Sequence, residues 1–462
     1  MGKPDLVITN GVFLTMDPNH EDPINGWMSV SDDGIIVEVG EGEPPSSKRV
    51  VDVGGSFVAP GFVSAHSHLF TSGSRGLAID KPLYAWIEGM TRYTEHASAD
   101  DIYWCTLHGA VDFLNNGITT AYDFTASRLT FRADSAEKGE YLGDLRPQGF
   151  SDAQFQAKLD SGIRFIHSVA LDDSVGSDQE VIDRFARSVK LAASCSDSKT
   201  VLGVAISGSV QWAASRRSAR LEVEAMRTFG IINQPHFLET SHGVSSQQER
   251  FAWYRDAGAL GPDLIFGHFI HTTDSIVQEA AQAGCAMVWQ PTSNARLGSG
   301  IADIPGYLRA GMRVGVGLDD QSCTDISDPW QNLRMGLYVL RAATRDPAVL
   351  GVREMLELHT LGSARALGID DRVGSLSSGK FADFLVVNPR SPDTGPVWNP
   401  WGTYVLACGL RNLKQVWIGG KLVSSDGVAT GIDQSRVSDE LHSRLGAISS
   451  RITEGDFNEA PS

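Results

Sequence analysis

Apolar, β-branched runs and amphipathic segments alternate along the middle of the chain, from about residue 58 to residue 370. We expect the apolar runs to be buried strands and the amphipathic segments to be helices, because each pattern follows the period of that structure. Several helical segments end at glycine, as helices commonly do. The predicted strands comprise residues 57–68, 118–124, 163–171, 200–207, 231–237, 264–271, 285–291 and 313–320.

Eight strands that alternate with helices favour a (β/α)8 barrel over an open doubly wound sheet. No glycine-rich phosphate loop follows the first strand, which also weakens a nucleotide-binding interpretation. The two ends of the chain differ from this middle. Short apolar runs with Asn-Gly and Asp-Gly turns recur there, and residues 404–410 are among them. The pattern therefore predicts an α/β protein, with a (β/α)8 barrel of the TIM type and a small β-sandwich domain built from both termini.

The same pattern sets the expected domain boundaries. We predict a composite β-sandwich domain from residues 1–57 plus 372–431, a barrel from residues 58–371, and a helical, then acidic, tail from residues 432–462. Residues 125–160 are polar and long for a connection between two elements. We expect them to form an extended loop or lid over the barrel mouth.

Composition narrows the class of protein. The chain has 39 Lys and Arg against 56 Asp and Glu, which gives a net charge of −17. This balance argues against nucleic acid or an anionic membrane as the main partner. No apolar run is long enough to span a bilayer, and the N-terminus lacks the layout of a secretory signal. The five cysteines are scattered without CxxC spacing, so we expect neither a disulfide framework nor a thiolate zinc site, and a reducing cytoplasm fits best.

Ionisable side chains stand where four of the predicted strands end. His66 and His68 close the first strand, and both imidazoles point the same way because alternate residues of a strand share a face. In a (β/α)8 barrel, functional side chains gather at the carboxyl ends of the strands. The other three strand ends carry His236 with Glu239, His268 with His271, and Asp319 with Asp320.

Each of these residues also has a simpler explanation. A single histidine at a strand end is more often a hydrogen-bonded structural residue, and an aspartate there is often the N-cap of the next helix. Four such strands that converge on one barrel mouth are hard to attribute to chance. Three imidazoles, one carboxylate and water make a divalent-metal site that suits zinc or ferrous iron, and the sequence does not separate the two.

Six segments, taken in order, resemble the successive signatures of the amidohydrolase superfamily. They read PGFVSAHSH, HFLE, GHFIH, PTSNARLG, GVGLDD and ARALGIDDRVGSLSSGKFADFLVV. The resemblance covers essentially the whole chain. It is closest to the cytosine-deaminase-like branch, which includes adenosine-type and S-adenosylhomocysteine deaminases, guanine deaminases and triazine hydrolases. Any one motif is weak, whereas their order and spacing make a strong match.

The resemblance implies roles for the strand-end residues. By position, His66, His68, His236 and Asp319 would bind one divalent ion, Zn²⁺ in the first instance and Fe²⁺ as the alternative. No lysine ends the run at 200–207, where two-metal relatives carry a bridging carbamylated lysine, and this supports a single metal.

The resemblance also implies the acid and base of the reaction. Glu239 stands where the family places a proton-shuttling glutamate, and it would protonate a ring nitrogen. His268 matches the histidine that orients the attacking water or polarises the leaving group. Asp319, beside the metal, would take a proton from the activated water, so that two carboxylates in different surroundings supply both tasks.

Four further residues are candidate substrate contacts. Trp86 and Glu95 fall in the first barrel loop, where adenosine-type deaminases have a pocket tryptophan and, nine residues on, a glutamate that holds ribose hydroxyls. The alternative for Trp86 is a residue of the core, and the alternative for Glu95 is a solvated helix residue. Asp320 could bind a cationic or amino-bearing substrate or cap the following turn, and His271 could contact the substrate or serve a structural purpose.

Two segments depart from the adenosine-type deaminase pattern. The run AISGSVQW has a serine where those enzymes have a substrate-contacting histidine, and LDDQSCTDISDPW replaces their usual sequence after the last strand. The sequence therefore names neither the ring nor its leaving group.

Together these observations predict a metal-dependent hydrolase that acts on C–N bonds of a nitrogen heterocycle, as an aminohydrolase (deaminase) that releases ammonia. The alternatives are a triazine-type hydrolase that displaces chloride or an alkylamine, a cyclic-amide hydrolase, and a catalytically silent scaffold. We expect a small-molecule substrate, no nucleic-acid or membrane partner, a cytoplasmic location, and a homo-oligomer that is a dimer or a tetramer.

Overall fold

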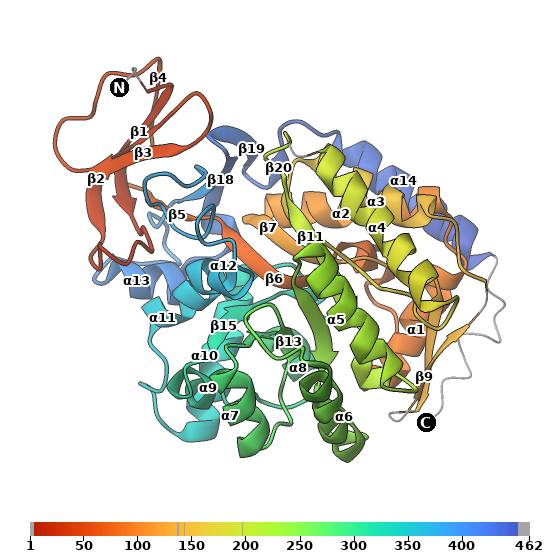
Figure 1. The fold of residues 1–462 in the computed structure, drawn as a ribbon. Coiled ribbons are helices and arrows are strands. Elements are labelled where there is room, and N and C mark those ends of the chain that lie inside the picture. The colour runs from red at the N-terminus through yellow and green to blue at the C-terminus, as the bar shows by residue number, and fades with distance from the viewer. Residues whose placement is uncertain (1–3, 136–137, 143, 196, 451–462) are drawn as a thin grey trace.

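The computed structural model describes residues 4–135, 138–142, 144–195 and 197–450. Two sheets organise this part of the chain: a parallel sheet in its middle and a mixed sheet that combines strands from both ends (Figure 1). The predicted fold, a TIM-type barrel with a β-rich unit from both termini, is therefore confirmed. The domain boundaries given above stay a prediction.

Within the described residues, nine β-segments make up the eight predicted barrel strands, all of them parallel. The last strand is interrupted, because β16 follows β15 after two residues and pairs with β6. This pairing sets Asp319 opposite Ser67 and Asp320 opposite His68, and it returns the sheet to its first strand. The segments are β6 (Phe62–His68), β7 (Ile118–Phe124), β10 (Arg164–Val169), β11 (Val201–Gly208), β12 (Asn233–Phe237), β13 (Ile265–His268), β14 (Ala286–Trp289), β15 (Arg313–Val316) and β16 (Asp319–Asp320).

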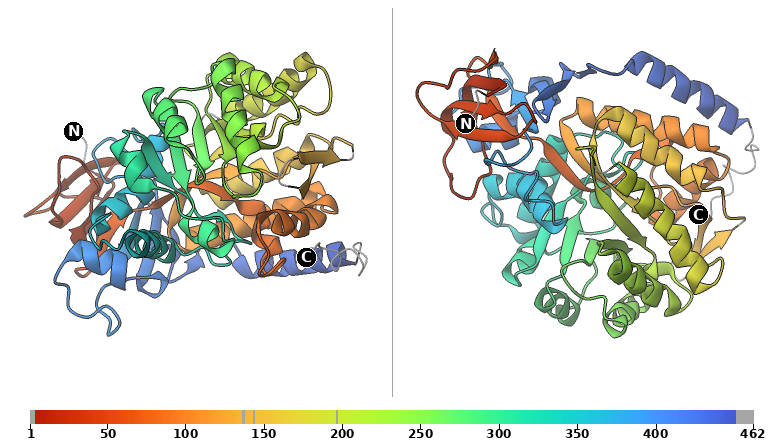
Figure 2. Two further views of the ribbon diagram at one scale, coloured as in Figure 1. Left: turned by 90° about the horizontal axis from the view of Figure 1, so that it is seen from below. Right: turned by 45° about the horizontal axis from the view of Figure 1, so that its top comes forward.

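Helices cover the outside of the barrel (Figures 1 and 2). Their ends follow from local sequence: Ser98 and Ser177 start α2 and α4 with reciprocal capping hydrogen bonds, and Gly230 and Gly258 end α5 and α6 with φ values of 62° and 74°. The helices are α1 (Leu83–Glu95), α2 (Ala99–Asn115), α3 (Gly149–Ser161), α4 (Asp178–Ser194), α5 (Arg217–Phe229), α6 (Val244–Ala257), α7 (Asp274–Gln282), α8 (Pro291–Arg296), α9 (Ile304–Arg309), α10 (Pro329–Thr344), α11 (Val352–Glu357) and α12 (Ser363–Ala366).

The mixed sheet joins the two ends of the chain through β5 (Phe57–Pro60). This strand lies parallel to β1 and antiparallel to β17, so an N-terminal and a C-terminal strand flank the segment that leads into the barrel. The other strands are β1 (Leu6–Phe13), β2 (Ile24–Val30), β3 (Ile36–Gly40), β4 (Arg49–Asp52), β17 (Phe384–Val387), β18 (Leu413–Ile418), β19 (Lys421–Ser425) and β20 (Val428–Ala429).

The β interpretation of residues 404–410 is wrong. Residues Thr403–Ala407 form a short helix that follows α13 (Pro400–Gly402). Tyr404 is buried there, with its ring 5.6 Å from that of Trp330 and 6.0 Å from that of Phe57. A short apolar run has the same appearance in a buried strand and in a buried helix, so packing decided what the pattern could not.

The expectation of one extended loop at residues 125–160 is also wrong in part. Residues Thr130–Ser135 and Lys138–Leu142 pair as an antiparallel hairpin, β8 and β9, and Gly149–Ser161 is the barrel helix α3. This helix buries Phe150, Phe155 and Ala157 against its neighbours, which the polar composition of the segment concealed.

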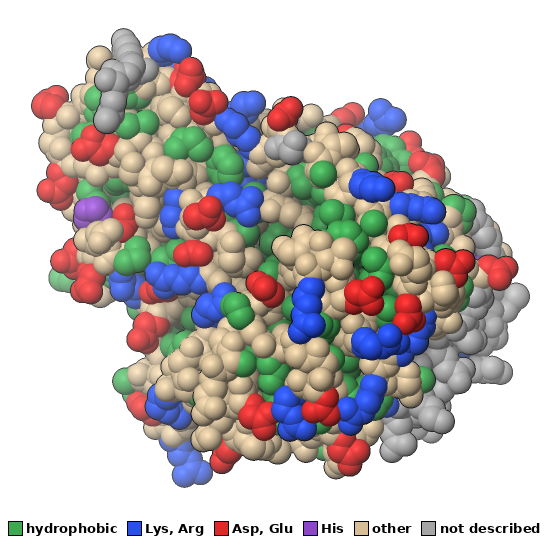
Figure 3. Space-filling view, in the orientation of Figure 1, with side chains coloured by type: hydrophobic (Ala, Val, Ile, Leu, Met, Phe, Trp, Pro, Cys, Tyr) green, Lys and Arg blue, Asp and Glu red, His purple; other side chains and the backbone are tan. Residues whose placement is uncertain are grey.

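The predicted helical tail corresponds to α14 (Gln434–Ser449), which lies along α2, where Arg444 contacts Asp101 at 3.2 Å (Figure 2). Its acidic end, residues 451–462, lies outside the described residues. None of the described helices is both long and apolar enough to cross a membrane. On the face drawn in Figure 3, acidic and basic side chains are interspersed.

A buried ion pair connects the barrel to the mixed sheet. Arg164 at the start of β10 donates to both carboxylate oxygens of Asp383, at 2.6 and 2.9 Å, and stacks over the ring of Phe381. Asp383 also accepts the backbone N–H of Gly419 at 2.8 Å, and both charged side chains are almost fully buried. Removal of one partner would leave an uncompensated charge in this interface.

We predict that Arg164→Met lowers the free energy of unfolding by about 3–5 kcal/mol, because Asp383 would stay buried without its cation. Urea unfolding followed by circular dichroism measures the change. Arg216→Met is the control, since its pair with Asp256 is largely exposed and screened by solvent. Equal unfolding midpoints for the two variants would show that the buried ion pair contributes no more to stability than the exposed one.

Candidate active site

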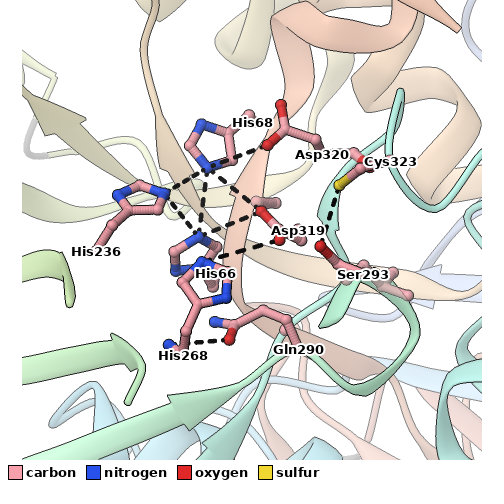
Figure 4. Close-up of polar contacts among 12 residues, drawn as sticks. His66, His68, His236, His268, Gln290, Ser293, Asp319, Asp320 and Cys323 are labelled. Atoms are coloured by element: carbon pink, nitrogen blue, oxygen red, sulfur yellow. Dashed lines mark hydrogen bonds and ion pairs between the residues drawn. The ribbon is translucent and has the colours of Figure 1, made fainter. Parts of the chain in front are cut away.

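The barrel gathers the predicted strand-end side chains at one end of the sheet (Figure 4). His66 is fully buried, whereas His68 on the same face of β6 keeps 12% of its side chain exposed. Each of the other contributing strands brings its polar residues to the same place. The residues that meet there are His66 and His68 from β6, His236 from β12, His268 from β13, and Asp319 and Asp320 from β16.

Three imidazole nitrogens and one carboxylate oxygen face a common point. Nε2 of His236 lies 3.1 Å from Nε2 of His66 and 3.1 Å from Nε2 of His68, and the latter two are 3.3 Å apart. Oδ1 of Asp319 lies 3.4 Å from Nε2 of His66 and 3.5 Å from Nε2 of His68. Ligand atoms around a tetrahedral zinc ion are about 3.3 Å from one another, so these donors have the spacing of such a site.

Gln234 of β12 fixes the tautomer of His66. Its side-chain amide donates a 3.0 Å hydrogen bond to the carbonyl oxygen of Ala65, which turns its Oε1 atom toward Nδ1 of His66 at 2.6 Å. His66 therefore carries its proton on Nδ1 and presents the Nε2 lone pair to the common point. A lone pair that faces other imidazoles and a carboxylate calls for a cation between them, and imidazole with carboxylate is a donor set that fits a divalent metal.

The pKa values in the cluster suit metal binding. Burial and the neighbouring His66 lower the pKa of His68 to about 3, and burial lowers that of His268 to about 3. Burial, with His66 and His68 close by, also holds the pKa of His236 well below its ordinary value. Burial would raise the pKa of Asp319, but its contacts with the adjoining imidazoles hold it well below its usual range. Neutral imidazoles and an ionised carboxylate are the forms that bind metals.

Glu239 stands beside the cluster with His268. Its Oε2 atom lies 3.5 Å from Nε2 of His268, which is 4.0 Å from Oδ2 of Asp319. The side-chain amide of Asn294 donates to Nδ1 of His268 at 2.9 Å, so that the histidine proton lies on Nε2, toward the two carboxylates. Burial, and the charge of Asp319, raise the pKa of Glu239 well above its ordinary value. The surroundings thus favour the ionised form of Asp319 and the protonated form of Glu239.

The backbone is strained at the same positions. His268 and Asp319 both have φ of 65°, and Leu238, next to Glu239, has φ of 55°. A non-glycine residue in this region costs about 1–3 kcal/mol and persists only where the surroundings enforce it. At His268, Gln290 provides part of that enforcement, because its Oε1 atom accepts the backbone N–H at 3.0 Å (Figure 4).

One cavity opens onto the cluster, and Glu239, His268, Asp319 and Asp320 line it. Oδ2 of Asp320 lies 3.7 Å from Nε2 of His68, and burial, with Asp319 adjacent, raises the pKa of Asp320 well above its ordinary value. Another part of the cavity lining is apolar and comes largely from α1. It includes Trp86 together with Leu83, Ile87 and Met90.

Two of the predicted substrate contacts do not line this cavity. Glu95 is exposed at the end of α1, where its neighbour Thr94 lines the cavity instead. His271 is turned away, because its Nε2 atom hydrogen-bonds the carbonyl oxygen of Ser299 at 2.7 Å. The structure therefore brings the proposed ligands, Glu239, His268, Asp320 and Trp86 together, and leaves Glu95 and His271 apart.

Sequence reasoning missed the amides that orient the histidines. Gln234 and Gln290 are fully buried polar residues within or at the end of apolar runs. Gln234 stands two residues before His236 and so shares its face of the strand. A glutamine two residues before His236 in an apolar run was therefore the sequence signal that could have predicted this contact.

The comparisons with known proteins agree with this geometry. Residues 57–423 match the amidohydrolase family. A 5-methylthioadenosine/S-adenosylhomocysteine deaminase from Syntrophobacter fumaroxidans is 28% identical over 440 residues, which are 92% of this chain and 94% of that protein. A zinc-bound adenosine deaminase from Xanthomonas campestris has a TM-score of 0.84 at 22% identity, over 97% of this chain and 99% of that one. A zinc complex of atrazine chlorohydrolase from Arthrobacter aurescens has a TM-score of 0.79 at 22% identity, over 95% and 100% of the two chains.

We predict that Gln234→Leu weakens metal binding about 10- to 100-fold, because His66 would lose the acceptor that fixes its tautomer. Competition with a chromogenic chelator measures the affinity for zinc. His66→Ala sets the lower limit, since it removes a proposed ligand outright.

The matched control is Gln156→Leu, which changes an exposed glutamine that hydrogen-bonds only Asp160 in the described structure. Zinc affinity should be unchanged there. Wild-type affinity in Gln234→Leu would exclude the orienting role of this amide.

Proposed function

The chain belongs to the amidohydrolase family, and from that premise we propose that it is a metal-dependent aminohydrolase. It would release ammonia from an amino-substituted nitrogen heterocycle. The observation that carries this proposal is the placement of two buried carboxylates, Glu239 and Asp319, 3.5 and 4.0 Å from Nε2 of His268, where the surroundings raise the pKa of the first and lower that of the second. Replacing a ring amino group by water requires such a base and such an acid at once.

His66, His68, His236 and Asp319 would hold the ion, which we propose to be Zn²⁺, with Fe²⁺ as the alternative. A divalent ion there would supply a water molecule whose pKa is lowered to about 7. The convergence of their donor atoms at 3.1–3.5 Å supports this assignment.

The protein residues then divide the proton transfers. Asp319, held ionised, accepts a proton from the attacking water. Glu239, held protonated, donates its proton to a ring nitrogen, so that the ring accepts the electron pair as the attacked carbon becomes tetrahedral. Nε2–H of His268 donates a hydrogen bond to the oxygen that attacks and keeps it in place. Asp319 passes the proton that it took from the water to the amino group, which leaves as ammonia when the C–N bond breaks.

A second candidate keeps this chemistry and changes the leaving group. The wall formed by Leu83, Trp86, Ile87 and Met90 would accept a ring with alkyl substituents, as in a hydrolase that displaces chloride or an alkylamine from a triazine. We favour ammonia release because the relatives that match by sequence over most of the chain carry deaminase names. We also propose that the protein is cytoplasmic and forms a homo-oligomer, a dimer or a tetramer. Light scattering after gel filtration would measure the number of subunits.

A substrate panel tests the proposal. The zinc-loaded protein is incubated with amino-substituted purines, pterins, pyrimidines and triazines, and with chloro- and alkylamino-triazines, and the products are assayed for ammonia, chloride and alkylamine. Ammonia from at least one class is the expected result. Chloride or alkylamine alone would favour the second candidate, and no product from any compound would contradict both.

We predict that Glu239→Gln retains zinc but loses turnover by at least about 100-fold, because the amide cannot deliver the proton that the ring nitrogen needs. Steady-state kinetics and chelator competition measure the two properties on one sample. Glu224→Gln, at an unburied position of α5, is the control and should match the wild type. An active Glu239→Gln enzyme would remove the proton-shuttle assignment.

A further inference from the structure

Three titratable side chains meet between the barrel strands β7 and β10 and the helix α3. Asp123 comes from β7, His167 from β10 and Lys158 from α3, and all three are fully buried. Nζ of Lys158 donates to Oδ2 of Asp123 at 2.5 Å and to Nδ1 of His167 at 2.9 Å. None of the three lines the cavity, and the proposed mechanism uses none of them.

This cluster is costly to bury. Burial raises the pKa of Asp123 and lowers that of Lys158, although each charge stabilises the other. Burial, with the charge of Lys158 close by, holds the pKa of His167 well below its ordinary value, so its Nδ1 atom accepts from the ammonium group. Nε2 of His167 then carries a proton that has no acceptor in the described part of the chain. Apolar side chains of similar volume are often as stable as a buried ion pair, so stability alone does not account for the cluster.

Asp123 also reaches the segment that carries two of the proposed metal ligands. Its second carboxylate oxygen, Oδ1, accepts the backbone N–H of Leu69 at 2.8 Å. Leu69 directly follows His68 and begins a short helix (Leu69–Ser74), which the side chain of His68 does not cap. The carboxylate therefore satisfies a backbone N–H at the point where the chain leaves β6.

The main-chain pairing of β6 with β7 ends before this point. The register between the two strands shifts between Ser64 and Ser67, and their last pair joins Ser67 to Asp123. His68 lies one residue beyond that pair. The hydrogen bond from Leu69 to the side chain of Asp123 thus extends the connection to β7 past the end of the ladder.

A purely structural explanation also exists. The ion pair of Lys158 with Asp123 joins α3 to the barrel, as the pair of Arg164 with Asp383 joins the barrel to the mixed sheet. Such a brace would contribute to the free energy of unfolding and leave metal binding unchanged. Of the two carboxylates, only Asp123 accepts a backbone N–H next to a proposed metal ligand.

We propose that Asp123 is a positioning residue for the metal site, and that it holds the backbone beside His68 so that the imidazole meets the ion. Lys158 fixes the carboxylate, and His167 fixes the ammonium group in turn. The inference rests on the proposed function, in which His68 is a metal ligand. A ligand whose backbone is fixed in advance loses less conformational entropy when the ion binds, so the hydrogen bond raises the affinity for the metal.

Two double variants test the acceptor at residue 123. Asp123→Asn/Lys158→Met removes both charges but keeps an oxygen that can accept from Leu69, whereas Asp123→Leu/Lys158→Met has a similar volume and no acceptor. Competition with a chromogenic chelator measures the affinity for zinc. We predict an affinity close to that of the wild type for the asparagine variant, and one lower by about 10- to 100-fold for the leucine variant.

Co²⁺ in place of zinc gives a second measurement that a brace would not change. Its visible absorption depends on the number and geometry of its ligands. We expect the wild-type spectrum in the asparagine variant and an altered spectrum in the leucine variant, because His68 would no longer be held in place. Neither measurement uses a substrate, so neither depends on which heterocycle the enzyme accepts.

Arg164→Met is the control for lost stability, because it breaks a buried ion pair whose hydrogen bonds involve none of the proposed ligands. Urea unfolding is measured for every variant, and Arg164→Met should bind zinc as the wild type does. Asp123→Val/Lys158→Met is a second variant without an acceptor, chosen because valine suits a strand.

The outcomes decide between positioning and bracing. Equal zinc affinity in the asparagine and leucine variants, both high or both low, would overturn the role of the acceptor. An equal loss of affinity in Arg164→Met would attribute the effect to stability and also overturn it. Failure of the asparagine variant to fold, or of both variants without an acceptor, would assign Asp123 to bracing and overturn the proposal.

Two further outcomes separate this inference from the proposed function. A wild-type protein that binds no zinc would overturn the metal site, and this inference with it. A protein that binds zinc and loses affinity as predicted, but releases no ammonia from any ring in the panel, would overturn the aminohydrolase alone.

Discussion

Repulsion among lone pairs is the constraint on which the rest of this structure depends. The Nε2 atoms of three imidazoles lie 3.1–3.3 Å apart, and Oδ1 of Asp319 lies 3.4–3.5 Å from two of them, where separately solvated groups would move apart. Strand geometry, the amide of Gln234 and positive φ angles at His268 and Asp319 all oppose that movement. A divalent cation would convert the repulsion into binding energy. The fold thus holds these donors where a divalent metal would bind.

Closure of the barrel is what brings the first and last of the proposed ligands together. Asp319 pairs across β16 and β6 beside His68, some 250 residues away in the chain. The loops beyond the two strands are joined as well. The hydroxyl of Thr71 donates to the carbonyl oxygen of His68 at 2.7 Å and accepts the backbone N–H of Gln321 at 3.0 Å. These hydrogen bonds cross the seam that closes the barrel, next to the proposed metal ligands His68 and Asp319.

The sequence predicted the barrel strands and the convergence at their ends, because apolar runs and strand-end histidines leave a local pattern. It did not predict the helix at Thr403–Ala407 or the hairpin and helix within residues 125–160, since burial against distant residues decides such segments. For the site, the sequence located the proposed ligands but not Gln234, whose role appears only in the hydrogen bond that it makes to His66. It also could not foresee that Glu95 is exposed while its neighbour Thr94 lines the cavity, because the packing of a helix decides which of two adjacent residues faces inward.

The difference between the features that the sequence predicted and those that it did not has a physical origin, which bears on substrate specificity. The proposed reacting groups come from strand ends, whose positions the barrel sets, whereas much of the remaining cavity lining comes from α1 and from the connection between β9 and α3. Because these segments contribute no strand to the barrel, substitutions in them would change the shape and charge of the pocket without moving the strand ends. Specificity for the substrate can therefore vary while the proposed chemistry is kept.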